Sequence, residues 1–280
     1  MSGDAIRLEG IRYQYAGSRS WALDGVDLVV RSGEIVGLVG PNDAGKSTVC
    51  LVAAALAPAV AGGRLEGLAW LVDGPTSELP AHEAARRCGV LFQNPLAQLS
   101  GTSATVWEEV AFGPRNVGLD RGLIAERVER CLELLRIGHL APRDPGRLSG
   151  GQAQLVAMAS VLALEPRALV LDEPTSQLDP EGTRLVGEAI RRVAGETGSG
   201  VLIVEHKTAL LASIADRVAV LAEGRTVLTG STLEVLADGS LPELGVDPPA
   251  AVRIGRTIGA AGLPPGLADR AMAAITAASA

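Results

Sequence analysis

The chain has 280 residues, 47% of them hydrophobic, which is enough for one large α/β domain with appendages, or for two modest domains, with a substantial buried core. The formal net charge is −7 and the arginines are scattered rather than clustered, which argues against a nucleic-acid-binding surface, so no nucleic-acid partner is expected. The longest apolar run, residues 49–61, contains Pro58 and is too short to span a bilayer, and the first residues lack the pattern of an export signal.

Short alternating strands are predicted in the first thirty residues, at residues 6–8 and 26–30, on either side of a turn with glycine and serine. They indicate a small antiparallel β layer. A buried strand over residues 35–39 follows and enters a glycine-rich loop, and residues 47–57 predict a helix that Pro58 ends.

The glycine-rich loop matches the pattern GxxxxGK[ST] of a phosphate-binding loop, and it lies between a strand and a helix, the context that makes the pattern specific. Its residues are Gly40, Pro41, Asn42, Asp43, Ala44, Gly45, Lys46, Ser47 and Thr48. In such a loop the backbone N–H groups face the phosphates of a nucleotide, Lys46 reaches the β and γ oxygens, and Ser47 ligates Mg²⁺. The alternative is a glycine-rich turn with an incidental lysine.

Composition favours the phosphate-binding interpretation. Only two of the 25 basic residues are lysines, Lys46 and Lys207. A chain that otherwise uses arginine keeps lysine where a compact ammonium group on a flexible stem is needed, as in this loop. For Lys207 no such reason is visible, and we expect it to be a chance surface residue.

Three further apolar runs, residues 90–92, 168–171 and 201–204, alternate with helical stretches and predict a mostly parallel sheet with helices on both faces. Polar residues follow these runs: Gln93 follows the first, Asp172-Glu173 the second, and Glu205-His206 the third. Ligands of such sheets lie beyond the carboxyl ends of the strands. We therefore expect these polar side chains to converge at one edge of the sheet.

The chemistry of these side chains suggests separate roles. Asp172 is expected to hold Mg²⁺ directly or through water, and Glu173 is the candidate general base for water, although an ordinary acidic strand exit is the alternative. His206 is a candidate to contact the γ-phosphate and orient the attacking water. A solitary histidine is usually structural, so we assign this role only because Lys46 and the two carboxylates are also present. Gln93 is a candidate sensor of Mg²⁺ and the γ-phosphate, or else a routine loop amide.

Helical periodicity between residues 94 and 165, clearest over residues 123–137, predicts an inserted helical subdomain that carries the sequence LSGGQ at residues 148–152. Residues 218–221 and 226–228 flank Glu223-Gly224, a hairpin signal near the end of the main domain, which we place at residue 236. Residues 237–280 are rich in proline, glycine and alanine. We expect them to form a small C-terminal extension with short helices at residues 250–261 and 267–278.

The three cysteines, Cys50, Cys88 and Cys131, are odd in number and widely spaced. They lack the spacing of metal ligands. We therefore expect three reduced, structural thiols, as is usual in a protein of the cytosol.

From about residue 6 to residue 236 the ordered motifs resemble the ATP-binding cassette (ABC) family of P-loop ATPases. The resemblance implies ATP and Mg²⁺ as ligands and the hydrolysis of ATP to ADP and phosphate. It also implies that Tyr15 stacks on adenine, that residues 176–179, with Asp179, form the D-loop that communicates across a dimer, and that His206 is the switch histidine. For Tyr15 the alternative is a strand aromatic packed on the β layer.

The LSGGQ run is similar to the family's signature motif. Its residues Ser149, Gly150, Gly151 and Gln152 supply a second phosphate-binding surface that cannot fold back onto the loop of the same chain. The resemblance therefore implies a dimer of identical or related ABC chains, in which each signature completes the ATP site of the other chain.

A narrower resemblance covers residues 92–99 and 106–114, which are similar to the ATPase subunits of energy-coupling factor importers for vitamins or transition-metal ions. It implies integral-membrane partners that contact the segment after Gln93, and a location at the cytoplasmic face of the cell membrane. Residues 241–245 also resemble that subfamily. The alternatives are an ATPase of another ABC transporter type, an exporter or a different importer, and a soluble ABC protein that acts on nucleic acid or ribosomes. Residues 94–99 could also be a simple helix start.

Four positions depart from these families. Asp43 stands where glycine is usual; aspartate tolerates a left-handed backbone better than most residues, so the loop can form, but the charge is expected to weaken nucleotide binding. Leu96 replaces an acidic residue of the subfamily's partner-binding segment. Ala153 and Leu155 stand where basic residues are common, so contacts around the signature helix are expected to differ.

Overall fold

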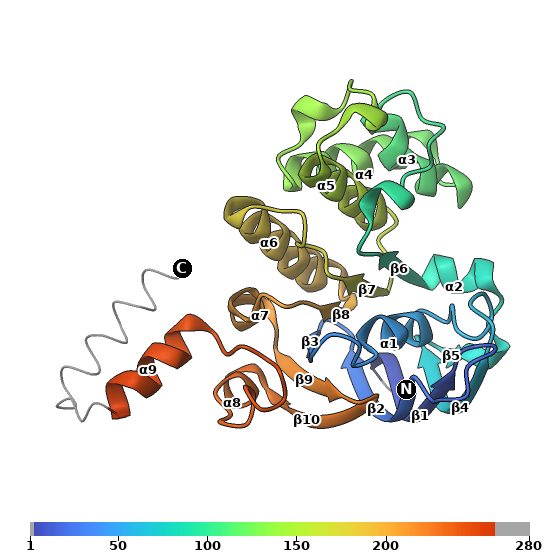
Figure 1. Ribbon diagram of the computed structural model, residues 1–280. Coiled ribbons are helices and arrows are strands. Elements are labelled where there is room, and N and C mark those ends of the chain that lie inside the picture. The colour runs from blue at the N-terminus through green and yellow to red at the C-terminus, as the bar shows by residue number, and fades with distance from the viewer. Residues whose placement is uncertain (1–2, 261–280) are drawn as a thin grey trace.

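The computed structural model describes residues 3–260 of the chain, which form two β-sheets and a separate group of helices (Figure 1). The first sheet is antiparallel, with strand order β2-β1-β4-β5. Its strands are β1 (Asp4–Gln14), β2 (Leu23–Arg31), β4 (Arg64–Leu71) and β5 (Gly74–Pro75). Fully buried residues of β1 alternate with less buried ones on either side of a register shift between Leu8 and Ile11: Ile6 and Leu8 lie before it, and Ile11 and Tyr13 after it. The predicted antiparallel β layer is confirmed.

The second sheet has six strands in the order β10-β9-β3-β8-β7-β6. They are β3 (Ile35–Val39), β6 (Cys88–Leu91), β7 (Ala168–Asp172), β8 (Gly200–Val204), β9 (Arg217–Ala222) and β10 (Arg225–Ser231). All pairs are parallel except the β9–β10 hairpin, which turns at Glu223 and Gly224, both left-handed. Every residue of β3, β7 and β8 is buried, as expected for strands with helices on both faces.

Helices cover the six-stranded sheet on both sides (Figure 1). The helix α1 (Lys46–Ala53) belongs to the core shared with the antiparallel sheet, whereas α6 (Pro180–Thr197) and α7 (Thr208–Ile214) belong to the other core. A short helix, α2 (Ala81–Arg87), precedes β6. The sequence predicted that the helix after the phosphate loop runs to residue 57, but α1 ends at Ala53. The chain turns at Ala55, whose φ of 58° is incompatible with a right-handed helix.

The predicted inserted helices lie between β6 and β7 in the sequence and stand apart from the sheets in Figure 1. They are α3 (Val106–Asn116), α4 (Arg121–Leu134) and α5 (Gly150–Leu162), with Thr105 and Ser149 as the N-caps of α3 and α5. Residues 95–97 form a single 3₁₀ turn. The fold is therefore the predicted α/β class, with an antiparallel layer, a mostly parallel core sheet and an inserted helical subdomain. Its boundaries at residues 94 and 165 stay a prediction.

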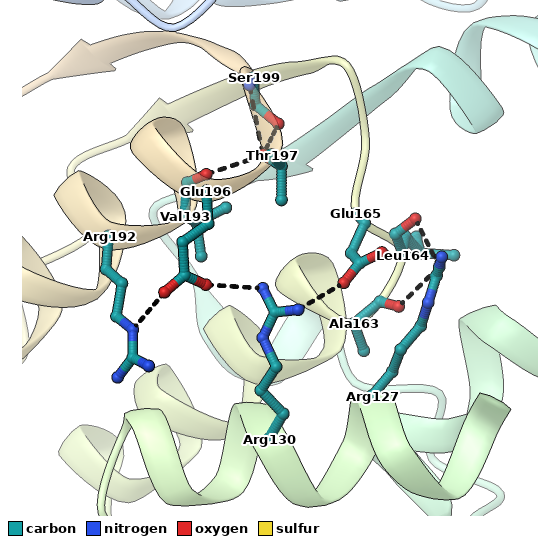
Figure 2. Close-up of polar contacts among 10 residues, drawn as sticks. All are labelled: Arg127, Arg130, Ala163, Leu164, Glu165, Arg192, Val193, Glu196, Thr197 and Ser199. Carbon is teal, nitrogen blue, oxygen red and sulfur yellow. Dashed lines mark hydrogen bonds and ion pairs between the residues drawn. The ribbon is translucent and has the colours of Figure 1, made fainter. Parts of the chain in front are cut away.

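A polar network joins the helical subdomain to α6 (Figure 2). Arg130 of α4 contacts Glu165 at 3.0 Å and Glu196 of α6 at 3.2 Å, and Arg192 contacts the same Glu196 at 2.7 Å. Arg127, one turn earlier on α4, donates to the carbonyl of Leu164 at 3.2 Å. The network therefore links α4, the segment after α5 and α6.

The segment after β10 returns to the core. The helix α8 (Thr232–Leu236) is followed by Leu241 and Val246, which are 0% and 6% exposed and belong to the main hydrophobic core. The helix α9 (Ala250–Ala260) agrees with the first helix predicted for the extension, and the second, at residues 267–278, lies outside the described residues. A domain boundary at residue 236 stays a prediction. Across residues 3–260, no helix combines the length and apolar character that crossing a bilayer requires.

Candidate active site

The phosphate loop needs glycine at two positions for different contacts. At Gly40, which has φ 156°, a Cβ atom would lie 2.1 Å from the carbonyl oxygen of Leu221. At Gly45, with φ 98°, it would lie 2.9 Å from the carbonyl oxygen of Ala22. Asp43 has φ 62°, so aspartate does adopt the left-handed conformation that the sequence analysis expected it to tolerate. The loop forms with its aspartate in place.

Lys46 opens α1 and points back along the loop. Its Nζ donates to the carbonyl oxygens of Gly40 at 2.9 Å and Pro41 at 2.7 Å, and the residue is 7% exposed. Burial lowers the pKa of the ammonium group, and the nearby carboxylates of Glu173, Asp172 and Asp43 act in the opposite direction. The N-cap of α1 is Gly45, which has no side chain to accept hydrogen bonds from the first N–H groups of the helix. These N–H groups are therefore available to a phosphate.

Asp172 ends β7 beside this loop. It is 6% exposed, and burial raises the pKa of its carboxyl, while a hydrogen bond with Ser47 and the charge of Lys46 act to lower it. A hydroxyl and a carboxylate are hard oxygen ligands of the kind Mg²⁺ requires, and an ion bound there would offset the cost of the buried charge. The residues present therefore fit a magnesium ion held by Ser47 and Asp172, with Gln93 nearby. That these three residues bind the ion stays a prediction.

Glu173 lies between two other predicted site residues, His206 and Gln93. Its Oε1 is 3.2 Å from Nε2 of His206, and its Oε2 accepts a hydrogen bond from Nε2 of Gln93 at 2.9 Å. The backbone of Glu173 is left-handed, with φ 51°, and its N–H donates to the carbonyl of Val204 on β8. The ends of three neighbouring strands thus bring these side chains together, which the parallel-sheet rule predicted.

A cavity of about 800 Å³ opens over the phosphate loop. Its wall includes Lys46, Gln93 and Glu173, together with Trp21, which the sequence analysis did not single out. The guanidinium of Arg12 lies 4.1 Å from the centroid of the Trp21 ring. An aromatic residue in the loop just before β2 was the only sequence signal for this part of the site.

Tyr15 lies beside the phosphate-loop helix. Its hydroxyl is 3.0 Å from Oγ1 of Thr48, and its ring meets the edge of Tyr13 with centroids 4.9 Å apart. The residue is 37% exposed, so its ring is not simply packed into the β layer. Its role against adenine stays a prediction.

The signature residues stand at the N-terminus of α5, in the helical subdomain. Ser149 accepts from the N–H of Gln152, and the Gln152 side chain accepts from the N–H of Ser149, which together form a capping box. Ser149 and Gly150 are exposed. Asp179 caps α6 by accepting from the N–H of Gly182 at 2.8 Å, and it is exposed as well. The wall of the cavity over the phosphate loop is built by other residues, so the fold does not bring the signature to its own chain's loop.

The expectation for Lys207 is wrong. Its Nζ donates to the carbonyls of Thr175 at 2.8 Å and Leu178 at 3.3 Å and to Oγ1 of Thr183 at 2.8 Å. The error arose because these partners come together only in the folded chain, about thirty residues away in sequence. Lys207 is therefore a structural residue beside the site.

The fold and these residues define a P-loop ATPase. A family model for ABC transporters matches residues 23–176, and the chain belongs to the ABC transporter family.

Relatives and solved structures agree with this assignment. The energy-coupling factor transporter ATP-binding protein EcfA1 of Symbiobacterium thermophilum is 40% identical over 275 residues, 94% of this chain and 92% of that protein. An ABC transporter ATP-binding protein of Methanosarcina mazei is 39% identical over 256 residues, or 91% of this chain. The matched region is only 43% of the length of that protein.

Among solved structures is cbiO1 of Clostridium perfringens, described as part of the ABC transporter complex cbiONQ. It superposes on this chain with a TM-score of 0.73 at 30% sequence identity, and the match covers 84% of this chain and 92% of the cbiO1 chain. The dimeric structure of MJ0796, a bacterial ABC transporter cassette, superposes with a TM-score of 0.72 at 25% identity, over 81% of this chain and 98% of that one.

Proposed function

We propose that this chain is the ATP-hydrolysing subunit of an energy-coupling factor importer, which supplies the energy to take up a vitamin or a transition-metal ion. Its partners would be integral-membrane subunits, and its place the cytoplasmic face of the cell membrane. The similarity to EcfA1 and to cbiO1 supports this choice. The main observation in favour of coupling between ATP hydrolysis and a membrane partner is the position of Gln93. Its side chain contacts Glu173, and the chain on either side of it lines an apolar groove.

Each side chain of the site has a task in this proposal. Lys46 would turn from its carbonyl partners to the phosphates of ATP, with Tyr15 against the adenine. Ser47, Asp172 and Gln93 would hold Mg²⁺, which neutralises charge on the phosphates when bound. Glu173 would accept the proton of the attacking water, and His206 would orient Glu173 and the γ-phosphate.

A second chain would complete the site. The exposed N-terminus of α5 offers N–H groups and the Ser149 hydroxyl to a phosphate, and it belongs to another part of the molecule than the phosphate loop. The dimer reported for the MJ0796 cassette supports the same arrangement here. ATP would then be held between Lys46 of one chain and residues 149–152 of the other, and hydrolysis would let the dimer reopen.

The groove next to Gln93 suits an apolar segment of a membrane protein. Its volume is about 320 Å³, and its walls come from the segment around β6 and from α3 and α5. The chain has only two phenylalanines, Phe92 and Phe112, and both line this groove with 39% and 42% of their surface exposed. Large apolar residues exposed together mark interaction sites. Gln98 fixes the groove edge by donating to the carbonyl of Val90 at 2.6 Å and accepting from the N–H of Phe92 at 3.0 Å.

Co-purification tests the proposal. The tagged chain is extracted from its own membranes with detergent, and its partners are identified by mass spectrometry. A stable complex with small integral-membrane subunits is expected. Phe112→Asp should abolish that complex and leave ATP binding intact, whereas Val227→Asp, at an apolar residue of β10 that is 47% exposed, should abolish neither. Recovery with exporter-type membrane subunits, or on RNA or DNA, would contradict the proposal.

A further inference from the structure

Both lysines of this chain hold the backbone of a loop. Lys46 donates to two carbonyls of the phosphate loop, and Lys207 donates to the carbonyls of Thr175 and Leu178. Hydrogen bonds from a charged donor are stronger than neutral ones, and Lys207 makes a third such bond to the Thr183 hydroxyl on α6. Lys207 therefore fixes both ends of the turn formed by residues 175–178, which we call the β7–α6 turn.

Glu205, two residues earlier, ties the same segments together a second time. Its Oε2 accepts from the Thr175 hydroxyl, and its Oε1 accepts from the N–H groups of His206 at 2.8 Å and Lys207 at 3.1 Å. Glu205 is 3% exposed and Thr175 is fully buried. A buried carboxylate with three donors is a rigid connection, because the loss of any one bond would leave the buried charge less well compensated. The end of β8 and the β7–α6 turn are thus one unit.

The two ends of this unit lie at different parts of the site. At one end His206, the residue between Glu205 and Lys207, lies 3.2 Å from the Glu173 carboxylate. At the other end the turn meets the signature. A Cβ atom added to Gly150 would lie 3.3 Å from Oε1 of Gln177, and one added to Gly151 would lie 3.3 Å from the carbonyl oxygen of Gln177. The bare backbone of the signature therefore packs on the turn that Lys207 holds.

We propose that Lys207 is a positioning residue that couples the hydrolytic centre of a chain to the signature surface of the same chain. The inference rests on the proposed dimer, in which that signature completes the partner's ATP site. A shift of His206 against Glu173 in one site would move Lys207, the β7–α6 turn and the signature, and so would be felt in the other site. The coupling runs within one chain and acts on its partner.

Mixed dimers with one working site test whether Lys207 acts on the partner's site, through the signature, or on the site of its own chain. Lys46→Ala in one chain disables that chain's own site, so that all hydrolysis occurs at the site whose phosphate loop belongs to the other chain. In the first dimer Lys207→Met is placed on the Lys46→Ala chain, whose signature serves the working site. In the second dimer Lys207→Met is placed on the other chain, which supplies the phosphate loop, Glu173 and His206 of the working site.

We expect kcat of the first dimer to fall about tenfold, the usual effect of losing a charge-assisted hydrogen bond, with KM for ATP unchanged. The second dimer should stay within about twofold of the Lys46→Ala and wild-type pair. Lys207→Arg, which keeps donors, should restore part of the rate. Arg191→Met, which also removes a bond from a cation to a carbonyl, that of Ser213 at 2.7 Å, is the matched control and should have no effect in either dimer.

Slowing of the second dimer alone, equal slowing of both, or no slowing of either would overturn the assignment of Lys207. Where Lys207→Met does not yield folded protein, Thr183→Val removes one partner only and should slow the first dimer in the same direction but less. Ser149→Arg on the Lys46→Ala chain separates the two proposals, because it should stop hydrolysis. Full activity in the Ser149→Arg dimer would overturn the shared ATP site itself. Loss of activity there, together with an unchanged rate for Lys207→Met in the first dimer, would overturn the coupling alone.

Discussion

Nε2 of His206 lies 3.2 Å from Oε1 of Glu173, a residue with a left-handed backbone at φ 51°. Gln93 holds the other carboxylate oxygen, and Val204 accepts the N–H of Glu173. Non-glycine residues adopt this conformation at an energetic cost, and they keep it where the surroundings determine it and function requires it. The carboxylate is thus fixed between two side chains that follow β6 and β8, the strands on either side of β7.

Changing Glu173 to Gln should trap an ATP-bound dimer. The amide keeps the size of the carboxylate and can still meet Gln93 and His206, but it cannot accept a proton from water, so we expect ATPase activity to fall by a hundredfold or more. With saturating Mg-ATP, size-exclusion chromatography with light scattering should report a dimer, and wild-type protein under the same conditions should return to monomer as it hydrolyses ATP. A variant that stays monomeric would contradict the proposed shared site.

Much of the site could be predicted from the sequence because it lies where strands end. The runs before Asp172 and His206 are fully buried strands, and the run before Gln93 overlaps the mostly buried strand β6; a parallel sheet places such strand ends at one edge whatever the intervening chain does. Lys46 followed from the motif alone. These predictions needed only the local sequence patterns and the rule that ligands bind at the carboxyl ends of parallel strands.

Other features depend on contacts that no local pattern encodes. The task of Lys207 depends on the carbonyls of a turn about thirty residues earlier, and that of Trp21 on a cavity wall formed by several loops. The strand β4 was missed because it is irregular. Gly67 has φ 91° within it, and Leu68 and Trp70 are exposed on its outer side, so the alternation of apolar and polar residues is blurred.

Changing Asp43 to Gly should leave the fold intact and tighten ATP binding by about two- to tenfold, since it removes a negative charge from a loop that binds phosphates. Glycine also accepts the φ of 62° without cost. Asp43→Asn separates the two effects, because asparagine tolerates the same backbone and carries no charge. Titration with a fluorescent ATP analogue at two salt concentrations should give a similar gain for both variants, smaller at high salt. An affinity unchanged or weakened in Asp43→Gly would refute the charge argument.

Trp21 should report nucleotide binding. Because it lines the cavity over the phosphate loop, ATP should change its environment, whereas Trp70 on β4 and Trp107 on α3 lie on other elements. In a chain with Trp70→Phe and Trp107→Phe, adding Mg-ATP should alter the remaining fluorescence. In that background Tyr15→Ala should weaken the binding by about fivefold or more if Tyr15 stacks on adenine, because stacking of a base on an aromatic side chain is worth about 1–3 kcal/mol. A remaining fluorescence that Mg-ATP leaves unchanged would refute the assignment.

Two neighbouring arginines of α4 should differ in their effect on stability. The side chain of Arg127 is 19% exposed and serves the carbonyl of Leu164 and the carboxylate of Glu165, so Arg127→Met should cost about 2 kcal/mol in the free energy of unfolding. Arg130 is 42% exposed and its ion pairs are at the surface, so Arg130→Gln should cost less than about 1 kcal/mol, and that cost should shrink at high salt. Urea unfolding of both variants at low and high salt measures the difference, and equal costs would contradict the ranking by burial.

The three cysteines should be inert to thiol reagents in the folded protein. Burial raises the pKa of Cys88 and Cys131 to about 12 and that of Cys50 well above its ordinary value, so reactive thiolate is scarce at pH 8. A chromogenic disulfide reagent should therefore label no cysteine in native protein and three in denaturant.

The same shifts determine how alkali affects stability. As pH rises above about 9, the thiols of the unfolded chain lose their protons while those of the folded chain keep them. The unfolded state then binds fewer protons, so the free energy of unfolding falls with pH, by about 1.4 kcal/mol per pH unit for each buried thiol. Urea midpoints at pH 8 and pH 10 should show this loss, and it should be smaller in Cys131→Ala once its lower starting stability is subtracted. An equal loss in that variant would mean that other groups cause the alkaline instability.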